Sequence, residues 1–136
     1  MKYFLILAGL VSASHMYAQS STVLEILEDQ IEAFNSKNID KLVANVSDDF
    51  KWYYIGSDTL LLEVDGKPQF KKSMEAYFNQ IKNVKSEIAE YAIDGNRISF
   101  KEIVKYETIS GKMNSASAMA IYEMKDDLIY RVWYFF

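Results

Sequence analysis

Histidine and cysteine, two side chains that often carry out catalysis or bind metal, are nearly absent from this sequence. Its 136 residues include one histidine, His15, and no cysteine. His15 lies in an N-terminal stretch that we expect to be removed from the mature protein. The remaining chain then has no imidazole or thiolate, which excludes Ser-His-Asp and Cys-His mechanisms and the usual zinc sites. Only carboxylates, tyrosines, lysines and arginines are left for catalysis.

Glu102 is the carboxylate best placed for chemistry, because it lies on an otherwise apolar face of a predicted strand. In the run from Arg97 to Thr108, alternate side chains point to the same face of a sheet. Glu102 therefore shares its face with Phe100 and Val104. This pattern predicts a carboxylate that faces a core or a pocket.

The last two predicted strands should complete this face. Small residues recur on the first of them and leave a groove for a ligand or for long side chains: Ala116, Ala118 and Ala120. If Asp126-Asp127 forms a two-residue turn, Tyr122 pairs with Arg131 across the hairpin. By the same register Ala120 pairs with Trp133, so Arg131 and Trp133 also face the groove.

Glu102 and Arg131 would then lie two strands apart, about 9 to 10 Å at the backbone, which their side chains can bridge. A buried charge without a partner is costly, so we expect the two to pair or to bind a polar ligand. A core ion pair with no ligand is the alternative. The candidate ligand-binding residues are Trp52, Tyr54, Tyr77, Glu102, Tyr106, Ala120, Tyr122, Arg131 and Trp133.

Two other acidic features carry less chemistry. Asp48-Asp49 could bind a metal ion, but such a pair between a helix and a strand is more typical of a turn. Asp58 lies in a predicted loop, where a solvated acid is the simpler interpretation. We therefore predict no metal site and no cofactor.

Three helices are predicted in the first part of the chain. Apolar residues at helical spacing indicate a helix that begins at Thr22, and Asn38 can cap a second helix that runs through Val46. Residues 47–49 should break this second helix before a strand at residues 50–55. Residues 60–64 could add a short strand, and a third helix should begin near Pro68.

The second half of the chain reads as four strands joined by turns. The predicted strands are Val84 to Ile93, Arg97 to Thr108, Ser115 to Met124 and Leu128 to Phe136. Polar and glycine-containing segments between them indicate hairpins. The order of elements predicts an α+β fold in which the helices pack on one face of a curved antiparallel sheet.

Two segments resemble the nuclear transport factor 2-like superfamily, which includes SnoaL-like cyclases and ketosteroid isomerases. These segments are residues 33–50, which include AFNSKNIDKLV and SDDF, and the closing hairpin from Ile121 to Trp133. The resemblance implies a cone-like curved antiparallel sheet wrapped around the three helices, with a pocket inside the cone. Matched to ketosteroid isomerase, it places Gln30, Tyr54 and Ala120 at the three acid/base positions. These replacements remove the known catalytic groups, so that activity is not expected.

Two main classes of function follow. The first is a secreted domain that binds a small apolar or aromatic molecule, and the second is an isomerase, cyclase or hydrolase with Glu102 as acid/base and Arg131 or a tyrosine as anion stabiliser. A purely associative module with a filled pocket is a third possibility. A net charge of −4 without a basic block gives no reason to expect nucleic acid as a partner.

The N-terminus predicts the location of the protein. Lys2, the apolar run from Tyr3 to Val11 and the small residues after it are typical of a signal peptide. We expect residues 1–18 to be removed and residues 19–136 to form the domain, secreted or periplasmic and free of the membrane. A permanent anchor is the alternative, although the run is short for a bilayer. An apolar stripe at Tyr130, Val132, Tyr134 and Phe136 predicts a covered surface, most simply the interface of a homodimer. An edge that packs on the N-terminal segment is the alternative.

Overall fold

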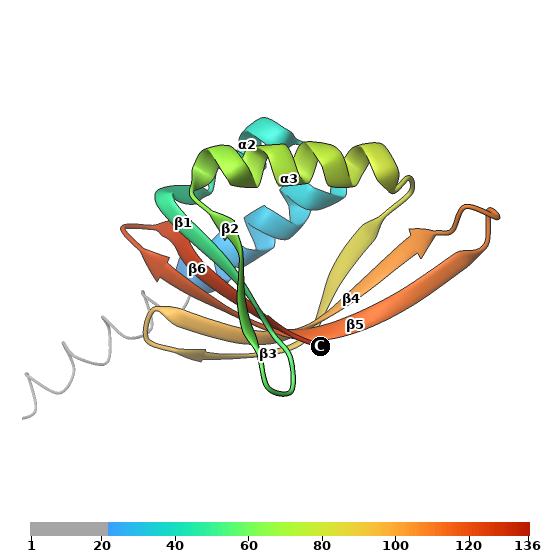
Figure 1. The fold of residues 1–136 in the computed structure, drawn as a ribbon. Coiled ribbons are helices and arrows are strands. Elements are labelled where there is room, and N and C mark those ends of the chain that lie inside the picture. Colours follow the sequence, from blue (N-terminus) through green and yellow to red (C-terminus); the bar gives the residue numbers. More distant parts are fainter. Residues whose placement is uncertain (1–21) are drawn as a thin grey trace, which may run out of the picture.

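The computed structural model describes residues 22–136, and its helices lie on one face of a strongly curved sheet (Figure 1). The predicted signal peptide, residues 1–18, lies outside the described residues. The described residues form three helices: residues 22–35, α2 (Ile39–Ala44) and α3 (Lys67–Gln80). Six strands follow or separate them: β1 (Val46–Ile55), β2 (Leu60–Asp65), β3 (Lys85–Asp94), β4 (Arg97–Glu107), β5 (Met113–Lys125) and β6 (Leu128–Phe135). The predicted α+β fold is confirmed.

The helix boundaries follow local chemistry with one correction. The side chain of Asn38 caps α2 as predicted, because its Oδ1 accepts a hydrogen bond of 3.0 Å from the Lys41 N–H. However, α2 ends at Ala44, not at Val46. The carbonyl of Asn45 accepts a 2.9 Å hydrogen bond from the Ile129 N–H, so the backbone pairs with β6 at this point and the helix ends. Residues 47–49, predicted as a break, therefore belong to β1.

The sheet has the strand order β2-β1-β6-β5-β4-β3 and is mixed. The prediction of an entirely antiparallel sheet is wrong at one position, because β1 and β6 pair in parallel. The other four pairings are antiparallel. The four strands from β3 to β6 follow one another, and the last of them arrives beside β1 in the same direction. The parallel pair closes the sheet between these two parts of the chain.

The hairpin from β5 to β6 contains the feature that changes the site. Its turn is the predicted one, since Asp126 and Asp127 both have positive φ, 53° and 59°. A β-bulge follows, so that Glu123 pairs with Arg131 and Tyr122 with Val132. An extra residue in one strand reverses the faces of all residues beyond it.

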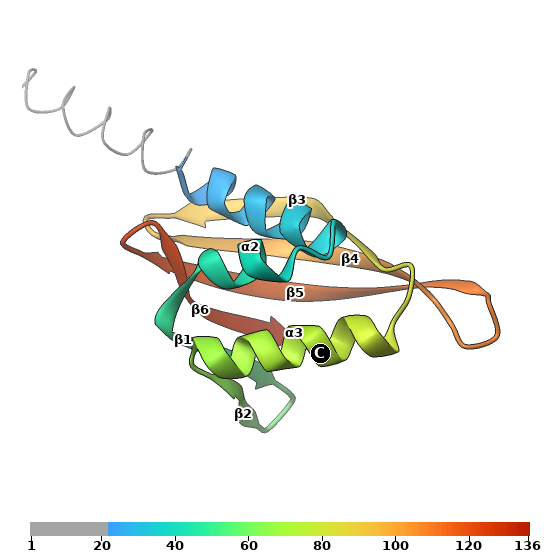
Figure 2. The same cartoon turned by 90° about the horizontal axis from the view of Figure 1, so that it is seen from above.

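The core lies between the helices and the inner face of the sheet. The view from above shows the helices lying across this face (Figure 2). Phe50 of β1 and Phe70 of α3 pack with their ring centroids 4.9 Å apart. Phe100 of β4 and Leu27 of the first helix are fully buried in the same cluster. Among residues 22–136, none of the helices combines the length and the hydrophobicity of a membrane span.

Candidate functional site

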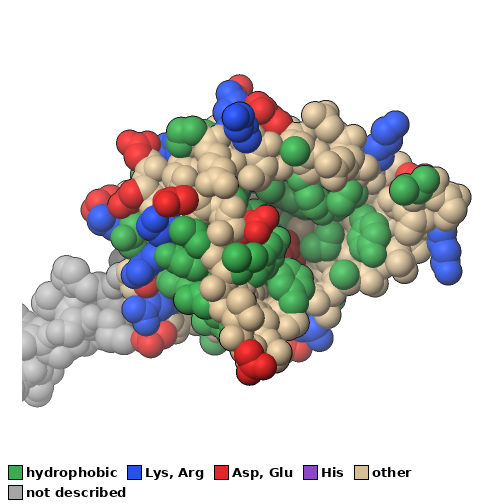
Figure 3. Space-filling model, viewed as in Figure 1, with side chains coloured by type: hydrophobic (Ala, Val, Ile, Leu, Met, Phe, Trp, Pro, Cys, Tyr) green, Lys and Arg blue, Asp and Glu red, His purple; other side chains and the backbone are tan. Residues whose placement is uncertain are grey.

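A cavity of about 340 Å³ opens between the helices and the inner face of the sheet. The space-filling view shows a hollow below α3, bordered by hydrophobic side chains (Figure 3). The residues that line the cavity are Gln30, Ile31, Phe34, Leu42, Trp52, Tyr54, Phe70, Met74, Tyr77, Ile81, Glu102, Val104, Tyr106, Ala116, Ser117, Ala118, Tyr122, Tyr134 and Phe136. The lining is mostly apolar and aromatic, as in pockets for small molecules.

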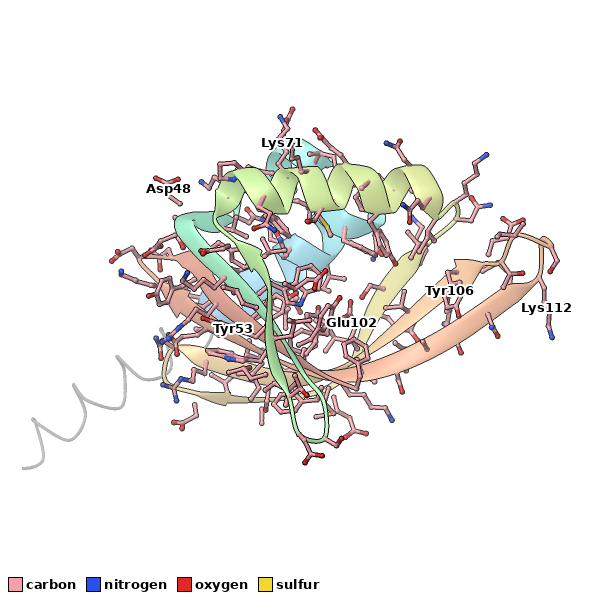
Figure 4. All side chains as sticks on the ribbon, viewed as in Figure 1. Asp48, Tyr53, Lys71, Glu102, Tyr106 and Lys112 are labelled. Carbon is pink, nitrogen blue, oxygen red and sulfur yellow. The ribbon has the colours of Figure 1, made fainter. Side chains whose placement is uncertain are left out.

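Among the described residues that line the cavity, Glu102 alone is charged, and it lies in the space between α3 and the sheet (Figure 4). Only 7% of its surface is exposed. The Ser86 hydroxyl donates a hydrogen bond to Glu102 Oε1. Ser86 is itself fixed by Asn35, whose side chain bonds both the backbone N–H of Ser86, at 2.7 Å, and its carbonyl, at 2.9 Å. The carboxyl group is therefore held by a supported partner.

Two tyrosines extend this polar network. The hydroxyl of Tyr134 is hydrogen-bonded to Glu102, and it lies 3.0 Å from the hydroxyl of Tyr122. Burial, helped by the nearby charge of Glu102, raises the pKa of Tyr122 and the pKa of Tyr134. Both tyrosines therefore stay neutral at physiological pH. The result is one connected polar network that spans the four neighbouring strands β3 to β6. Its members are Ser86, Glu102, Tyr134 and Tyr122.

Burial raises the pKa of Glu102 above the ordinary value of a glutamate. The hydrogen bonds from Ser86 and Tyr134 act in the opposite direction but do not cancel this effect. No lysine, arginine or histidine among the described residues forms a salt bridge with Glu102. Glu102 is thus a carboxyl group in an apolar cavity that keeps its proton to a higher pH than usual.

Aromatic rings form the wall beside this carboxyl group. The rings of Trp52 and Tyr134 lie 5.3 Å apart between centroids, and those of Tyr54 and Phe136 lie 5.1 Å apart. The indole N–H of Trp52 is buried and has no hydrogen-bond partner in the part of the chain that the structure describes. A buried donor of this kind is normally satisfied, so it is available to a ligand or a water molecule.

Arg131 does not reach Glu102, and the predicted pair between them is wrong. The Arg131 guanidinium pairs with Glu123 instead, with 2.7 Å between Nη2 and Oε1. Trp133 lies on the same outer face and stacks on Tyr53, with ring centroids 6.0 Å apart. Neither Arg131 nor Trp133 lines the cavity. The bulge after Glu123 is the cause, because it moves both side chains to the opposite face of the sheet.

The same shift corrects the predicted outward stripe. Tyr134 and Phe136 line the cavity, and Val132 is buried in the core. Tyr130 differs from them, since its ring contacts the guanidinium of Arg131 at 4.8 Å. These residues therefore do not form one outward face.

Six of the nine predicted ligand-binding residues line the cavity: Trp52, Tyr54, Tyr77, Glu102, Tyr106 and Tyr122. Ala120 is buried beneath it without lining it, whereas the neighbouring Ala116 and Ala118 do. Sequence reasoning missed Ser86 and Tyr134. Tyr134 could have been found only with the position of the bulge, and Ser86 only with the register that pairs it with Val104.

The other acidic candidates, Asp48, Asp49 and Asp58, do not line this cavity. Asp48 projects from the surface and pairs with Lys67 at 3.2 Å (Figure 4). Within residues 22–136, no group of three or more histidine, cysteine, aspartate or glutamate side chains is arranged to hold a metal ion. At the position matched to a catalytic tyrosine, Gln30 uses its Oε1 to accept a 2.9 Å hydrogen bond from the Asn45 amide.

The fold and the cavity define a small α+β domain with an apolar pocket between its helices and its sheet. Residues 27–132 match the SnoaL-like domain. The chain therefore belongs to the SnoaL-like domain family. No curated protein matches the chain.

Solved structures show the same fold at low sequence identity. A cystatin-fold protein from Novosphingobium aromaticivorans is 21% identical, with a TM-score of 0.70 and coverage of 82% of this chain and 96% of the other. An epoxide hydrolase of M. tuberculosis is 13% identical, with a TM-score of 0.71 and coverage of 85% and 83%. A protein from Catenulispora acidiphila with a ketosteroid isomerase-like fold, solved with trimethylamine, is 12% identical, with a TM-score of 0.70 and coverage of 82% and 85%.

Proposed function

We propose that this protein binds a small, mostly apolar molecule in the aromatic cavity. The observation that carries the proposal is the cavity of about 340 Å³, which is open and has a single charged group in its lining. A domain that served only for association would not need such a space, and its own side chains would fill it. The relative from Catenulispora acidiphila, solved with trimethylamine, supports a fold that can hold a small molecule.

A titration with the neutral fluorophore N-phenyl-1-naphthylamine tests this proposal. Ala118→Phe should fill part of the cavity and abolish the rise in fluorescence, because Ala118 lines it. Ser115→Phe is the matched control, since Ser115 is exposed and lies outside the lining. Equal binding by the wild type and both variants would place the fluorophore elsewhere. No binding by the wild type would contradict the proposal.

An enzyme is the second candidate, and the raised pKa of Glu102 favours it. A carboxyl group whose pKa is raised by burial is suited to general acid/base catalysis. Glu102 would transfer the proton in an isomerase, cyclase or hydrolase reaction, and the Tyr134 hydroxyl would stabilise the negative charge that develops. Arg131 has no part in this scheme because it lies on the other face.

Native mass spectrometry of protein purified from its source distinguishes these two functions. The ligand released from the wild type would be incubated again with wild type or with Glu102→Gln. An unchanged ligand mass and retention time in both samples supports binding alone. Conversion by the wild type, together with loss of conversion by Glu102→Gln, would establish catalysis.

Secretion is a further part of the proposal, and it rests on Lys2 and the apolar run to Val11. Exported protein should begin at or near Gln19 when its N-terminus is sequenced. A cytosolic pool that retains Met1 would contradict secretion.

We also propose a homodimer, formed through the outer face of the sheet. The Tyr53–Trp133 stack lies on this face, and Met119 of β5 is 51% exposed there. Light scattering at tens of micromolar should give the mass of a dimer. Met119→Lys should dissociate it, whereas Leu61→Lys, a change at a similarly exposed residue of β2, should not. A wild-type monomer would contradict this part of the proposal.

A further inference from the structure

The lining that residues 22–136 give the cavity contains one charged side chain, Glu102, and no counter-charge for it. The groups bonded to Glu102 are the hydroxyls of Ser86 and Tyr134, which are neutral. The titratable side chains that face it from the packed elements are Tyr77 of α3 and Tyr122 of β5. Within the described lining there is no lysine, arginine or histidine.

An uncompensated carboxylate determines which ligand charges the cavity can accept. An anion would be repelled at close range in a region of low dielectric constant. A cation would supply the missing counter-charge, and buried charges in proteins are normally paired. The two hydroxyl donors already stabilise the ionised form of Glu102, so a cation completes a site that is partly prepared for it.

The aromatic lining favours the same kind of ligand. The faces of Trp and Tyr rings attract cations, and rings grouped around a site are the usual way in which proteins bind ammonium groups. Trp52, Tyr54 and Tyr77 lie in this lining. Burial raises the pKa of Tyr77, with a smaller effect of Glu102, so its ring stays neutral. Burial also raises the pKa of Tyr54, with a smaller effect of Glu63, a second acidic side chain.

We propose that the cavity binds an organic cation: an ammonium group on an apolar body, with the ammonium beside Glu102 and the body along the small residues Ala116 and Ala118. This inference rests on the proposed binding function and specifies its ligand class. It uses the aromatic wall and the buried carboxylate together, whereas a purely apolar ligand would leave Glu102 unused.

Two probes of the same shape, one positively charged and one neutral, test the preference of the cavity for a cation. Phenyltrimethylammonium carries a fixed positive charge, and tert-butylbenzene is its neutral counterpart. Their binding can be followed by tryptophan fluorescence in a Trp133→Phe background, because Trp52 then remains as the reporter in the cavity and Trp133 lies outside it. We expect the cation to bind at least about tenfold more tightly than the neutral probe at pH 8.

Variants of two glutamates separate the local charge from the net charge. Glu102→Gln keeps the shape of the side chain and should remove most of the preference for the cation while leaving the affinity for tert-butylbenzene within about twofold. Glu87→Gln removes the same charge from an exposed position on β3, where Glu87 pairs with Lys105 at 3.1 Å, and should leave the preference intact.

The outcomes distinguish this inference from the function on which it rests. If tert-butylbenzene binds as tightly as phenyltrimethylammonium to the wild type, the inference is overturned and small-molecule binding stands. If neither probe nor the neutral fluorophore binds, the proposed function itself fails. If Glu102→Gln retains the full preference, the positive charge is recognised elsewhere and the assigned site is wrong. The comparison of the two probes needs no variant at Glu102, so it holds even if Glu102→Gln does not fold.

Discussion

Replacement of Glu102 by glutamine should remove a loss of stability that the wild type suffers as the pH rises. Glu102 is buried, and burial raises its pKa in the folded protein above the value near 4.5 that a glutamate ordinarily has. At a pH between the ordinary pKa and the raised pKa, the folded state therefore holds a proton that the unfolded state has already released. Because folding then requires proton uptake, the free energy of unfolding falls as the pH increases through this interval.

The size of the effect follows from the linkage between protonation and folding. Below about pH 4.5 the carboxyl group is protonated in both states and costs nothing. Between this pH and the raised pKa, the free energy of unfolding should fall by up to about 1.4 kcal/mol per pH unit from Glu102 alone. Above the raised pKa the group is ionised in both states, and the loss is complete. Glutamine does not titrate, so the variant lacks this contribution.

This pH dependence can be measured by urea unfolding of the wild type and of Glu102→Gln. The measurements are made at intervals of half a pH unit between pH 4 and pH 9. The difference between the two free energies of unfolding should change between about pH 4.5 and the raised pKa of Glu102. It should be constant below and above this range. Glu123→Gln is the matched buried control. Although burial acts to raise its pKa, Arg131 and Arg97 together hold the pKa of Glu123 below the ordinary value, so its contribution should be lost only as the pH falls. Parallel curves for the wild type and Glu102→Gln above pH 4.5 would refute the reasoning.

Three further predictions test the geometry of the fold by urea unfolding. A double-mutant cycle of Glu123 and Arg131 should give a coupling energy of about 1 kcal/mol, which partial exposure of the pair reduces. A cycle of Glu102 and Arg131 should give less than about 0.5 kcal/mol, because these two side chains lie on opposite faces of the sheet. A larger coupling for the second pair than for the first would contradict the bulge. Asn38→Ala should cost about 1 kcal/mol by loss of the α2 cap, and Asn38→Asp should restore it. Phe100→Ala should cost about 3 to 5 kcal/mol because Phe100 is 1% exposed, and a cost below 1 kcal/mol would show that it is not in the core.

The sequence was sufficient for the order of elements and for one side of the site. Helical spacing, the Asn38 cap and Pro68 predicted the helices, and alternation in β4 placed Glu102 on the inner face. These features depend on neighbours within a few residues, and so they can be read along one segment. The two-residue turn at Asp126-Asp127 was found for the same reason.

The tertiary structure decided which residues complete the site. Alternation can be carried along a strand only until a bulge occurs, and the bulge opposite Glu123 in the β5–β6 hairpin moved Arg131 out of the cavity and Tyr134 into it. Ser86 reaches Glu102 because β3 and β4 pair in one particular register. The parallel contact of β1 with β6 joins strands from opposite ends of the domain, so no local pattern encodes it. Local preferences therefore specified the helices and strands, and long-range pairing between strands determined which side chains meet in the cavity.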